Sequence, residues 1–331
     1  MQPSYEQPLA DYVRYFAEHT PQNVAYTDGD EQCIYKQLDL YTNQVANGIA
    51  ALGCAEGDRI AYLGINSGAY VQVFFGSCKA KTIYVGLNWR LTARELEYIL
   101  NDSGVSVVFS DAEFIPMYER LKNDVLSLKR VVTVDSPAFE RWRNKYSQND
   151  PFLDHSPQDP ALQFYTSGTT GKPKGVMLSN YCMAEHRRSE NAWGDWYLSS
   201  KRLAEGVQEI IINAMPNFHI GGLGWLLIGL FRGAKVILMA APEPEAFLDL
   251  VEAQKDTHLF AVPVVLGMML ESQKKTPRDL GSLKIFHYGA SPIAPSMLKE
   301  AIEVMGCGFI QYYGMTETNG TVTSLKPQDH Q

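Results

Sequence analysis

Cysteine is scarce in this sequence, and its few thiols are poorly spaced for cross-links. No CxxC pair is present, and five thiols cannot all pair within one chain. This pattern fits a reducing cytosol without excluding a disulfide, and it argues against a structural zinc site. The cysteines are Cys33, Cys54, Cys78, Cys182 and Cys307.

Positive charge and long hydrophobic runs are also lacking. The 29 Lys and Arg are outnumbered by 37 Asp and Glu, so we expect no nucleic-acid partner. The N-terminal segment MQPSYEQPLADYVRYF has no secretory pattern. The most apolar windows, 220–231 and 259–270, contain glycine or proline and are shorter than the roughly 20 residues of a membrane helix. We therefore expect a cytoplasmic protein without a transmembrane segment.

What the sequence does contain is an alternation of β-branched runs and amphipathic helices. Apolar residues that recur at every third or fourth position predict a helix from Lys36 to Gly53. Thr92 and Glu95 predict a capping box at the start of another helix. Helices are also predicted at 244–254 and 295–305. The predicted strands are 59–64, 105–110, 130–134, 162–165, 209–214, 235–239, 259–262, 284–288 and 309–313. This alternation predicts an α/β fold of layered, largely parallel β-sheets flanked by helices.

Three polar motifs directly follow predicted strands. TSGTTGKPKG follows LQFY, GASP follows KIFHY, and GMTE follows FIQYY. Open parallel sheets bind ligands beyond the carboxyl ends of their strands, which makes these motifs the candidate site. The polar, proline-bearing stretch 147–160 is the best internal boundary in the chain.

The first motif, residues 166–175, suits a polyphosphate. Its three glycines allow close approach of backbone amides, four hydroxyl side chains add donors, and two lysines add positive charge. It is not a Walker loop, because Gly168 and Gly171 are too close together and Lys172 precedes Pro173. Pro173 predicts an extended, mobile arm in the second half. The alternative is a solvated hairpin that binds nothing.

The stretch YTSGTTGKPKGVMLSN resembles the phosphate-loop signature of the adenylate-forming superfamily, which comprises acyl-CoA synthetases, peptide-synthetase adenylation domains and luciferases. PNFHIGGL, YGASP and YYGMTE resemble the family's other segments and stand in the same order. KTIYVGLNWRLTARELEYIL resembles its N-terminal lobe. The resemblance implies an incomplete N-terminal adenylate-forming domain over residues 1–331, with two similar α/β subdomains at approximately 58–190 and 1–57 plus 200–325.

The resemblance implies a carboxylic acid:CoA ligase that uses ATP, Mg²⁺ and coenzyme A. Its relatives attack the α-phosphorus of ATP with a carboxylate, release pyrophosphate and pass the acyl group to a thiol. That chemistry needs an environment that neutralises anions. The residues that the resemblance assigns to the β- and γ-phosphates are Thr166, Ser167, Gly168, Thr169, Thr170 and Lys174. Lys172 is expected nearby, and Gly171 is expected to belong to the same binding loop.

The other two motifs correspond to the nucleotide and metal contacts of the family. Glu317 is expected to bind Mg²⁺, and one carboxylate suffices because this cation keeps water and phosphate ligands. Thr316 is expected to contact the α-phosphate. The expected adenine contacts are Tyr313 on one side and Gly289, Ala290 and Ser291 on the other. Gly314 and Met315 are also expected to bind the nucleotide. Alternatively, Ser291 caps the next helix, and the Thr-Glu pair only begins a turn.

His219 in PNFHIGGL lies, by resemblance, beside the carboxylate and CoA tunnel. We expect a gating or carboxylate-orienting role for it and no metal, although a lone histidine is often structural. The glycine-rich segment 220–230 is then expected to line the acyl side. Tyr312 stands where relatives often have glycine, which we expect to narrow the acyl pocket or alter the adenine contact. The catalytic residues implied are His219, Thr316, Glu317 and Lys174.

Complete relatives continue with an aspartate that binds the ribose, a hinge, and a small C-terminal lid domain that carries a lysine. None of these is present in the 331 residues, so we expect a fragment or a natural truncation with weak or no activity alone. The leading hypothesis for the full-length protein is a CoA ligase of fatty or related aliphatic acids. The protein could also form a homodimer, which the sequence leaves open. The competing hypotheses are an adenylation domain that loads a carrier protein, an aryl-acid:CoA ligase and a noncatalytic nucleotide-binding module.

Overall fold

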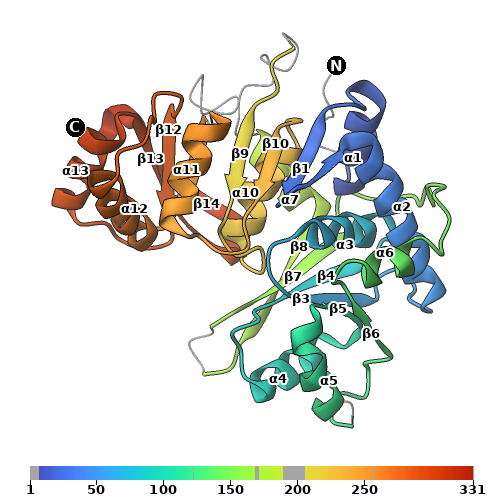
Figure 1. Ribbon diagram of the computed structural model, residues 1–331. Helices are drawn as coiled ribbons and strands as arrows, with labels where there is room; N and C mark the ends of the chain where they lie inside the picture. The colour runs from blue at the N-terminus through green and yellow to red at the C-terminus, as the bar shows by residue number, and fades with distance from the viewer. Residues whose placement is uncertain (1–6, 122, 168–170, 189–205, 256, 331) are drawn as a thin grey trace. The chain divides into compact units, whose positions relative to one another are not determined.

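The computed structural model describes the chain except for residues 1–6, 122, 168–170, 189–205, 256 and 331, which are a thin grey trace in Figure 1. It divides into two compact units. Unit 1 comprises Met1–Gln22 and Cys33–Arg188, and unit 2 comprises Asn23–Gln32 and Ser189–Gln331.

Unit 1 contains a six-stranded sheet with the order β6-β5-β3-β4-β7-β8. Its neighbouring strands are parallel except for the antiparallel pair β7 and β8. The strands are β3 (Arg59–Leu63), β4 (Ile83–Leu87), β5 (Val105–Ser110), β6 (Arg130–Thr133), β7 (Pro160–Thr166) and β8 (Lys174–Ser179). The helices are α1 (Leu9–His19), α2 (Tyr35–Ala51), α3 (Gly68–Lys79), α4 (Ala93–Ser103), α5 (Ile115–Leu121), α6 (Ala138–Arg143) and α7 (Asn180–Arg188), with the 3₁₀ turn η1 (Ala112–Phe114).

Local signals set helix α4 as expected. The capping box of α4 is confirmed, because the Thr92 amide donates to Glu95 Oε2 at 2.8 Å and the Glu95 amide donates to Thr92 Oγ1 at 3.4 Å. Gly104 ends this helix in the left-handed region, where glycine is favoured. Leu96 and Leu100 of α4 pack into a core with the buried side chains of β3, β4 and β5. Both faces of these strands are buried, as is typical of parallel sheets.

Unit 1 includes N-terminal residues that we expected to find in the other subdomain. Helices α1 and α2 pack against α3, and α2 approaches so closely that a Cβ on Gly76 would collide with Val45. Residues 7–22 and 33–57 therefore belong with the first unit, which corrects the expected grouping of 1–57 with 200–325, and only 23–32 lie in unit 2 as expected. The close approach of α2 requires glycine at position 76. Nothing in the sequence around Gly76 indicates this requirement, because Val45 is distant along the chain.

The stretch 147–160 is not a boundary, contrary to the expectation from its composition. Asn47 of α2 donates to the carbonyls of Ser147 and Asn149, both at 2.9 Å. Arg14 of α1 makes a two-pronged contact with the Asp150 carboxylate at 2.6 and 2.7 Å. These contacts with α1 and α2, together with the assignment of the stretch to the same compact unit, place it inside unit 1.

Unit 2 contains an eight-stranded sheet with the order β14-β13-β12-β11-β9-β10-β1-β2. Neighbouring strands are parallel from β1 through β10, β9, β11 and β12 to β13. Strand β14 is antiparallel to β13. The strands are β1 (Val24–Asp28), β2 (Glu31–Ile34), β9 (Ile210–Asn213), β10 (Lys235–Leu238), β11 (His258–Ala261), β12 (Ile285–Gly289), β13 (Gly308–Met315) and β14 (Gly320–Leu325). The helical elements are α10 (Ile220–Leu230), α11 (Pro244–Gln254), α12 (Pro263–Lys275), α13 (Pro295–Met305), η3 (Thr316–Thr318) and η4 (Pro327–His330).

The two apolar windows of the sequence form core elements of unit 2. One is α10, whose leucines are buried, and the other runs through β11 into α12. In the part of the chain that the structure describes, no helix is both long and apolar enough to cross a membrane. Helices α11 and α13 have the predicted bounds, and each begins with proline, which is well suited to the first helical position. The predicted α/β class is confirmed.

Candidate functional site

The glycine- and lysine-rich motif of unit 1 connects two antiparallel strands. Thr166 at the end of β7 is paired with Lys174 at the start of β8, so Ser167 and residues 171–173 lie at the tip of a β7–β8 hairpin. The extended geometry expected after Pro173 is confirmed, but Lys174 onward is a paired strand and not a mobile arm. Ser167 and Lys174 are exposed, and Thr166 is partly buried. Gly168, Thr169 and Thr170 lie outside the described residues.

The described residues around this hairpin tip include a glycine and two exposed lysines. Gly171 has φ +84°, a conformation that favours glycine. Lys172 Nζ lies 5.3 Å from the ring centroid of Tyr98 in α4, within cation–π range. Lys172 and Lys174 are both exposed, so both ammonium groups are accessible to an anion.

The base of the hairpin is braced by a hydrogen-bonded series that the sequence did not predict. Gln163 Nε2 donates to the Tyr165 hydroxyl at 3.0 Å, and this hydroxyl donates to Asp102 Oδ2 of α4 at 2.6 Å. Gly175 on β8 lies so close to Gln163 that a Cβ would collide with its side chain. Burial, together with the bond to Asp102, raises the pKa of Tyr165, which therefore stays a donor at neutral pH. The series fixes the strands from which the motif projects.

In unit 2 the GASP motif forms a strained turn at the carboxyl end of β12. Ala290 has φ +68°, in the left-handed region that side chains with a Cβ rarely adopt. Gly289 needs to be glycine, because a Cβ would lie 2.6 Å from the Tyr312 carbonyl oxygen on β13. Ser291 is exposed and does not cap α13, whose N-terminal cap is Ala294. The alternative of a capping serine was wrong because Pro295, four residues later, sets the first turn.

The GMTE motif forms the end of β13 and the short turn η3. Gly314 lies against the Gly320 carbonyl, so no side chain fits there, and the β13–β14 pairing shifts between Tyr313 and Gly314. Thr318 Oγ1 closes the turn by accepting from the Met315 amide at 3.2 Å. Tyr313 and Met315 are 65% and 48% exposed, as adenine contacts would have to be.

Glu317 lies in η3, beyond the end of β13. It is exposed, and Thr316 beside it is partly buried. Within the described ranges, no cluster of three or more His, Cys, Asp or Glu side chains is arranged to hold a metal ion by itself. One exposed carboxylate nevertheless fits Mg²⁺, because this cation takes one or two protein carboxylates and completes its octahedron with phosphate oxygens and water.

The parallel sheet brings the two nucleotide motifs of unit 2 together. β12 and β13 are neighbours, and Gly289 is paired with Tyr312, so their carboxyl ends meet at one edge (Figure 1). β9 has the same direction through its pairing with β11, so His219, which follows β9, starts α10 at this edge. His219 is exposed, and its ring centroid lies 4.6 Å from that of Phe218.

The glycines at the start of α10 have different reasons to be small. Gly222 lies on the Pro216 carbonyl, where a Cβ would collide, so it serves helix packing. A Cβ on Gly221 would only touch the ring of Phe260 on β11, at 3.8 Å. A methyl group on Gly221 would therefore be in ordinary van der Waals contact with Phe260.

A buried polar chain crosses the sheet beneath this edge, and the sequence analysis missed it. His258 Nδ1 lies 3.1 Å from His287 Nε2, and His287 Nδ1 lies 2.7 Å from the Tyr312 hydroxyl. His258 Nε2 lies 3.9 Å from Glu209 Oε2. Burial, and secondarily the proximity of His258, lowers the pKa of His287 well below its usual value. The only signal in the sequence was a histidine inside each of two apolar strands.

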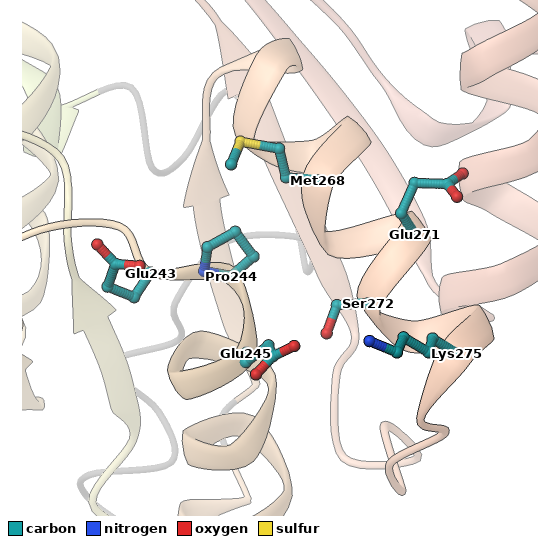
Figure 2. Close-up of a pocket in the computed structure, with 7 residues that line it drawn as sticks. All are labelled: Glu243, Pro244, Glu245, Met268, Glu271, Ser272 and Lys275. Atoms are coloured by element: carbon teal, nitrogen blue, oxygen red, sulfur yellow. The ribbon is translucent and has the colours of Figure 1, made fainter.

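The pocket drawn in Figure 2 shares no residue with these motifs. It lies between the start of α11 and the outer face of α12, with a volume of about 500 Å³. Three of its side chains are carboxylates and one is an ammonium, which would repel a triphosphate. Its lining residues are Glu243, Pro244, Glu245, Met268, Glu271, Ser272 and Lys275.

Comparison with known proteins agrees with these motifs. A family model described as AMP-binding enzyme matches residues 13–331. Fatty acid–acyl-carrier-protein ligase ScoC of Streptomyces coeruleorubidus is 35% identical over 98% of this chain and 61% of its own length. Indoleacetate–CoA ligase of Aromatoleum aromaticum is 30% identical over 98% of this chain and 62% of its own length. The chain thus spans about three fifths of the curated relatives it matches.

The fold is similar to solved structures as well. The inhibitor-bound N-terminal domain of FACL13 from Mycobacterium tuberculosis superposes with a TM-score of 0.88 at 25% identity, covering 98% of this chain and 79% of that domain. A match of the family model to nearly the whole chain, together with relatives of this identity, is decisive. The protein belongs to the AMP-binding enzyme family, whose members include adenylate-forming acyl- and aryl-CoA ligases.

Proposed function

We propose that the full-length protein activates a fatty or related aliphatic acid with Mg-ATP to an acyl-adenylate and passes the acyl group to coenzyme A. The observation that carries the proposal is the meeting of the GASP and GMTE motifs at the carboxyl ends of two neighbouring parallel strands. Ligands of open α/β sheets gather at such edges, and this edge offers an aromatic face, a thin backbone and a carboxylate.

Adenine recognition is assigned to the two strand ends. The exposed ring of Tyr313 offers one stacking face, and the turn Gly289–Ser291 offers a backbone without bulky side chains. The left-handed Ala290 holds this turn in one shape before the ligand arrives, which lowers the entropic cost of binding. Gly314 and Met315 extend the same surface from β13.

The phosphates are assigned to the unit 1 hairpin, Thr316 and Glu317. Thr166, Ser167 and Gly171 would supply donors to the β- and γ-phosphates, with the undescribed Gly168, Thr169 and Thr170 between them. Lys172 and Lys174 would offset negative charge as the carboxylate approaches the α-phosphorus. Glu317 would hold Mg²⁺, which supplies charge neutralisation at the phosphate oxygens when bound. Thr316 would contact the α-phosphate.

His219 is assigned to the carboxylate and acceptor side. Its exposed ring precedes α10, and Gly221 in the first turn of this helix presents no side chain. A neutral imidazole there can donate one hydrogen bond to the substrate carboxylate and orient it toward the phosphorus. The same ring can swing aside for the thiol, which is the gating role.

The acceptor has a second candidate, a carrier protein. The ScoC relative, at 35% identity, is named for transfer to acyl-carrier protein, whereas the indoleacetate relative is named for transfer to CoA. Both acceptors carry the same kind of terminal thiol, so the adenylation half of the proposal is unaffected by this choice. The acyl class remains fatty or aliphatic in the proposal, with an aryl acid as its alternative.

The test is pyrophosphate release by the full-length protein against a panel of fatty, short aliphatic and aryl carboxylates. Release is expected only with ATP, Mg²⁺ and a matching acid, followed by a thioester when CoA or a phosphopantetheine-bearing carrier protein is added. Release without any carboxylate, or no release with any acid, would refute the ligase and favour a noncatalytic nucleotide-binding module. A thioester on the carrier protein but not on CoA would change only the acceptor in the proposal and would leave the adenylation step as proposed.

A further inference from the structure

Helix α4 contacts the β7–β8 hairpin of unit 1 at two points (Figure 1). Near the tip, Lys172 Nζ lies 5.3 Å from the ring centroid of Tyr98. At the base, the Tyr165 hydroxyl donates to Asp102 Oδ2 at 2.6 Å. Tyr98 and Asp102 stand one helical turn apart in the sequence, so they project from the same face of α4. One face of this helix therefore holds the hairpin both at its base and near its tip.

Helix α4 is itself fixed within unit 1. Its apolar face is buried in the core of the sheet, and the capping box closes its first turn. Asn101 donates to the Asp124 carbonyl at 3.0 Å, which ties the last turn to the segment after α5. Tyr98 and Tyr165 both pack against the same core. A helix held in this way can impose a position on the hairpin, because its own packing keeps it in place.

The pairing of β7 with β8 decides on which side of the hairpin each group lies. Tyr165 is paired with Gly175, and Thr166 is paired with Lys174. Neighbouring residues of a strand project from opposite faces, so Lys174 lies with Thr166 on the face opposite that of Tyr165. Lys172, in contrast, is turned toward α4. The two ammonium groups can therefore approach an anion at the tip from different sides.

The ring of Tyr98 holds Lys172 without cancelling its charge. A carboxylate partner would offset the ammonium charge, whereas an aromatic face attracts the cation through the ring quadrupole and adds no opposite charge. Lys172 is exposed, so its ammonium group can meet a phosphate while it lies over the ring. A side chain that is held in advance also loses less rotamer freedom when the ligand binds. The contact therefore favours the binding of a polyphosphate.

We propose that Tyr98 and Asp102 are positioning residues, which hold the β7–β8 hairpin on α4 so that Lys172 meets the β- and γ-phosphates of ATP from a fixed place. The inference rests on the proposed function and explains how the hairpin favours a nucleoside triphosphate over a monophosphate. AMP lacks the β- and γ-phosphates. Loss of either contact with α4 is therefore expected to weaken the binding of ATP and to spare the binding of AMP.

The first experiment compares two nucleotides by calorimetric titration of the full-length protein. The probes are the Mg²⁺ complex of AMP-PNP, a nonhydrolysable ATP analogue, and AMP. Tyr98→Leu removes the aromatic face but keeps an apolar side chain against the core. It is expected to weaken AMP-PNP binding about two- to fivefold and to leave AMP binding unchanged. Tyr98→Phe keeps the aromatic face, so it is expected to bind both nucleotides as the wild type does.

A double-mutant cycle tests whether Tyr98 acts through Lys172. Lys172→Met removes the ammonium group, and it is expected to weaken AMP-PNP binding at least as much as Tyr98→Leu does. In a protein that already carries Lys172→Met, Tyr98→Leu is expected to add nothing, because the ring then has no cation to hold. Effects that multiply in the double variant would show that the two residues act independently, and this result would overturn the role of Tyr98.

Asp102 provides a test in which charge alone predicts the opposite result. Removal of a carboxylate near a bound triphosphate would by charge alone strengthen ATP binding. Asp102→Ala releases the Tyr165 hydroxyl from α4, so it is expected instead to weaken AMP-PNP binding about two- to tenfold. Asp102→Asn keeps an acceptor oxygen and is expected to retain most of the affinity.

The matched control is Glu97→Ala. It removes a carboxylate from the same helix, at a position about 100° around the helix axis from Tyr98. This variant is expected to bind AMP-PNP at least as tightly as the wild type. A loss of affinity in Glu97→Ala equal to that in Asp102→Ala would trace the effect to α4 in general and overturn the role of Asp102.

The outcomes separate this inference from the proposed function. A wild-type protein that binds neither nucleotide overturns both. A wild-type protein that binds AMP-PNP, with unchanged affinity in Tyr98→Leu and in Asp102→Ala, overturns the inference alone. Equal losses for AMP-PNP and AMP would indicate a general loss of structure and overturn it as well. Tighter AMP-PNP binding by Tyr98→Leu would mean that the ring keeps Lys172 away from the phosphates, the reverse of the proposal. If Asp102→Ala does not fold, Tyr98→Leu and the double-mutant cycle decide.

Discussion

Replacement of Ala290 by glycine tests the strain at the proposed adenine turn. The left-handed φ of +68° costs a residue with a Cβ about 1 to 2 kcal/mol, whereas glycine adopts it freely. Glycine in turn loses about 0.5 to 1 kcal/mol more chain entropy on folding. The methyl group of Ala290 is exposed, so little burial is lost. The expected net result is that Ala290→Gly raises the free energy of unfolding by about 0.5 to 1 kcal/mol.

Gly306 provides the matched control for this substitution. It ends α13 with φ +65°, and an added Cβ would have no atom within 4 Å, so Gly306→Ala changes the backbone cost without creating a clash. This variant is expected to lower the free energy of unfolding by about 1 kcal/mol. Urea unfolding followed by circular dichroism measures both, provided the dependence on denaturant stays constant.

The same variant tests what the strain does for binding. If the turn is shaped in advance, Ala290→Gly is expected to weaken the affinity for a nonhydrolysable acyl-adenylate analogue about two- to fivefold, the equivalent of about 0.5 to 1 kcal/mol of added flexibility. Calorimetric titration of the full-length protein measures the dissociation constant. A destabilised Ala290→Gly, beside a Gly306→Ala that behaves as expected, would refute the argument from backbone strain.

Three further predictions concern charged groups. Glu317→Gln is expected to lower kcat/KM for Mg-ATP about tenfold or more without changing the melting temperature, and unchanged turnover would count against the metal role. Removal of both Lys172 and Lys174 is expected to raise the KM for ATP about tenfold, and an unaltered KM would dissociate the hairpin from the phosphates. Burial raises the pKa of Asp111 from 3.8 to about 6. The contribution of its protonation to the free energy of unfolding is therefore fully present below about pH 4 and is lost as the pH rises through about 6. Asp111→Asn is therefore expected to raise the free energy of unfolding above pH 7 by about 1 kcal/mol, after allowance for partial exposure, and to change it little below pH 4. Urea unfolding at both pH values measures this difference, and equal effects at the two pH values would refute the prediction.

Much of the candidate site could be predicted because its signals are local. Thr92 and Glu95 are close in sequence and cap the same helix, and the bounds of α11 and α13 follow from prolines at their first turns. The positions of GASP and GMTE after their strands were equally readable, because runs of β-branched and aromatic residues ended in glycine-bearing turns. Alternation with helices then implied parallel strands and a common edge.

Other features of the site had no local signal. Nothing beside Gly289 in the sequence indicates that the Tyr312 carbonyl would occupy the space of its Cβ. The left-handed Ala290 was hidden as well, because alanine is not a residue that this conformation favours. The contact of His258 with His287 joins residues from different strands, and it depends on the register between β11 and β12.

The sequence by itself determined the α/β class, most strands and four of the helices that the structure describes, and the motifs that identify the family, because periodicity, capping and turn chemistry act over a few residues. Only the tertiary structure decided that residues 7–22 and 33–57 pack in unit 1, and that a carboxylate, two imidazoles and a tyrosine form one buried chain in unit 2. The physical reason is that strand order, register and close helix approach depend on contacts between distant residues, whose pairing local patterns do not encode.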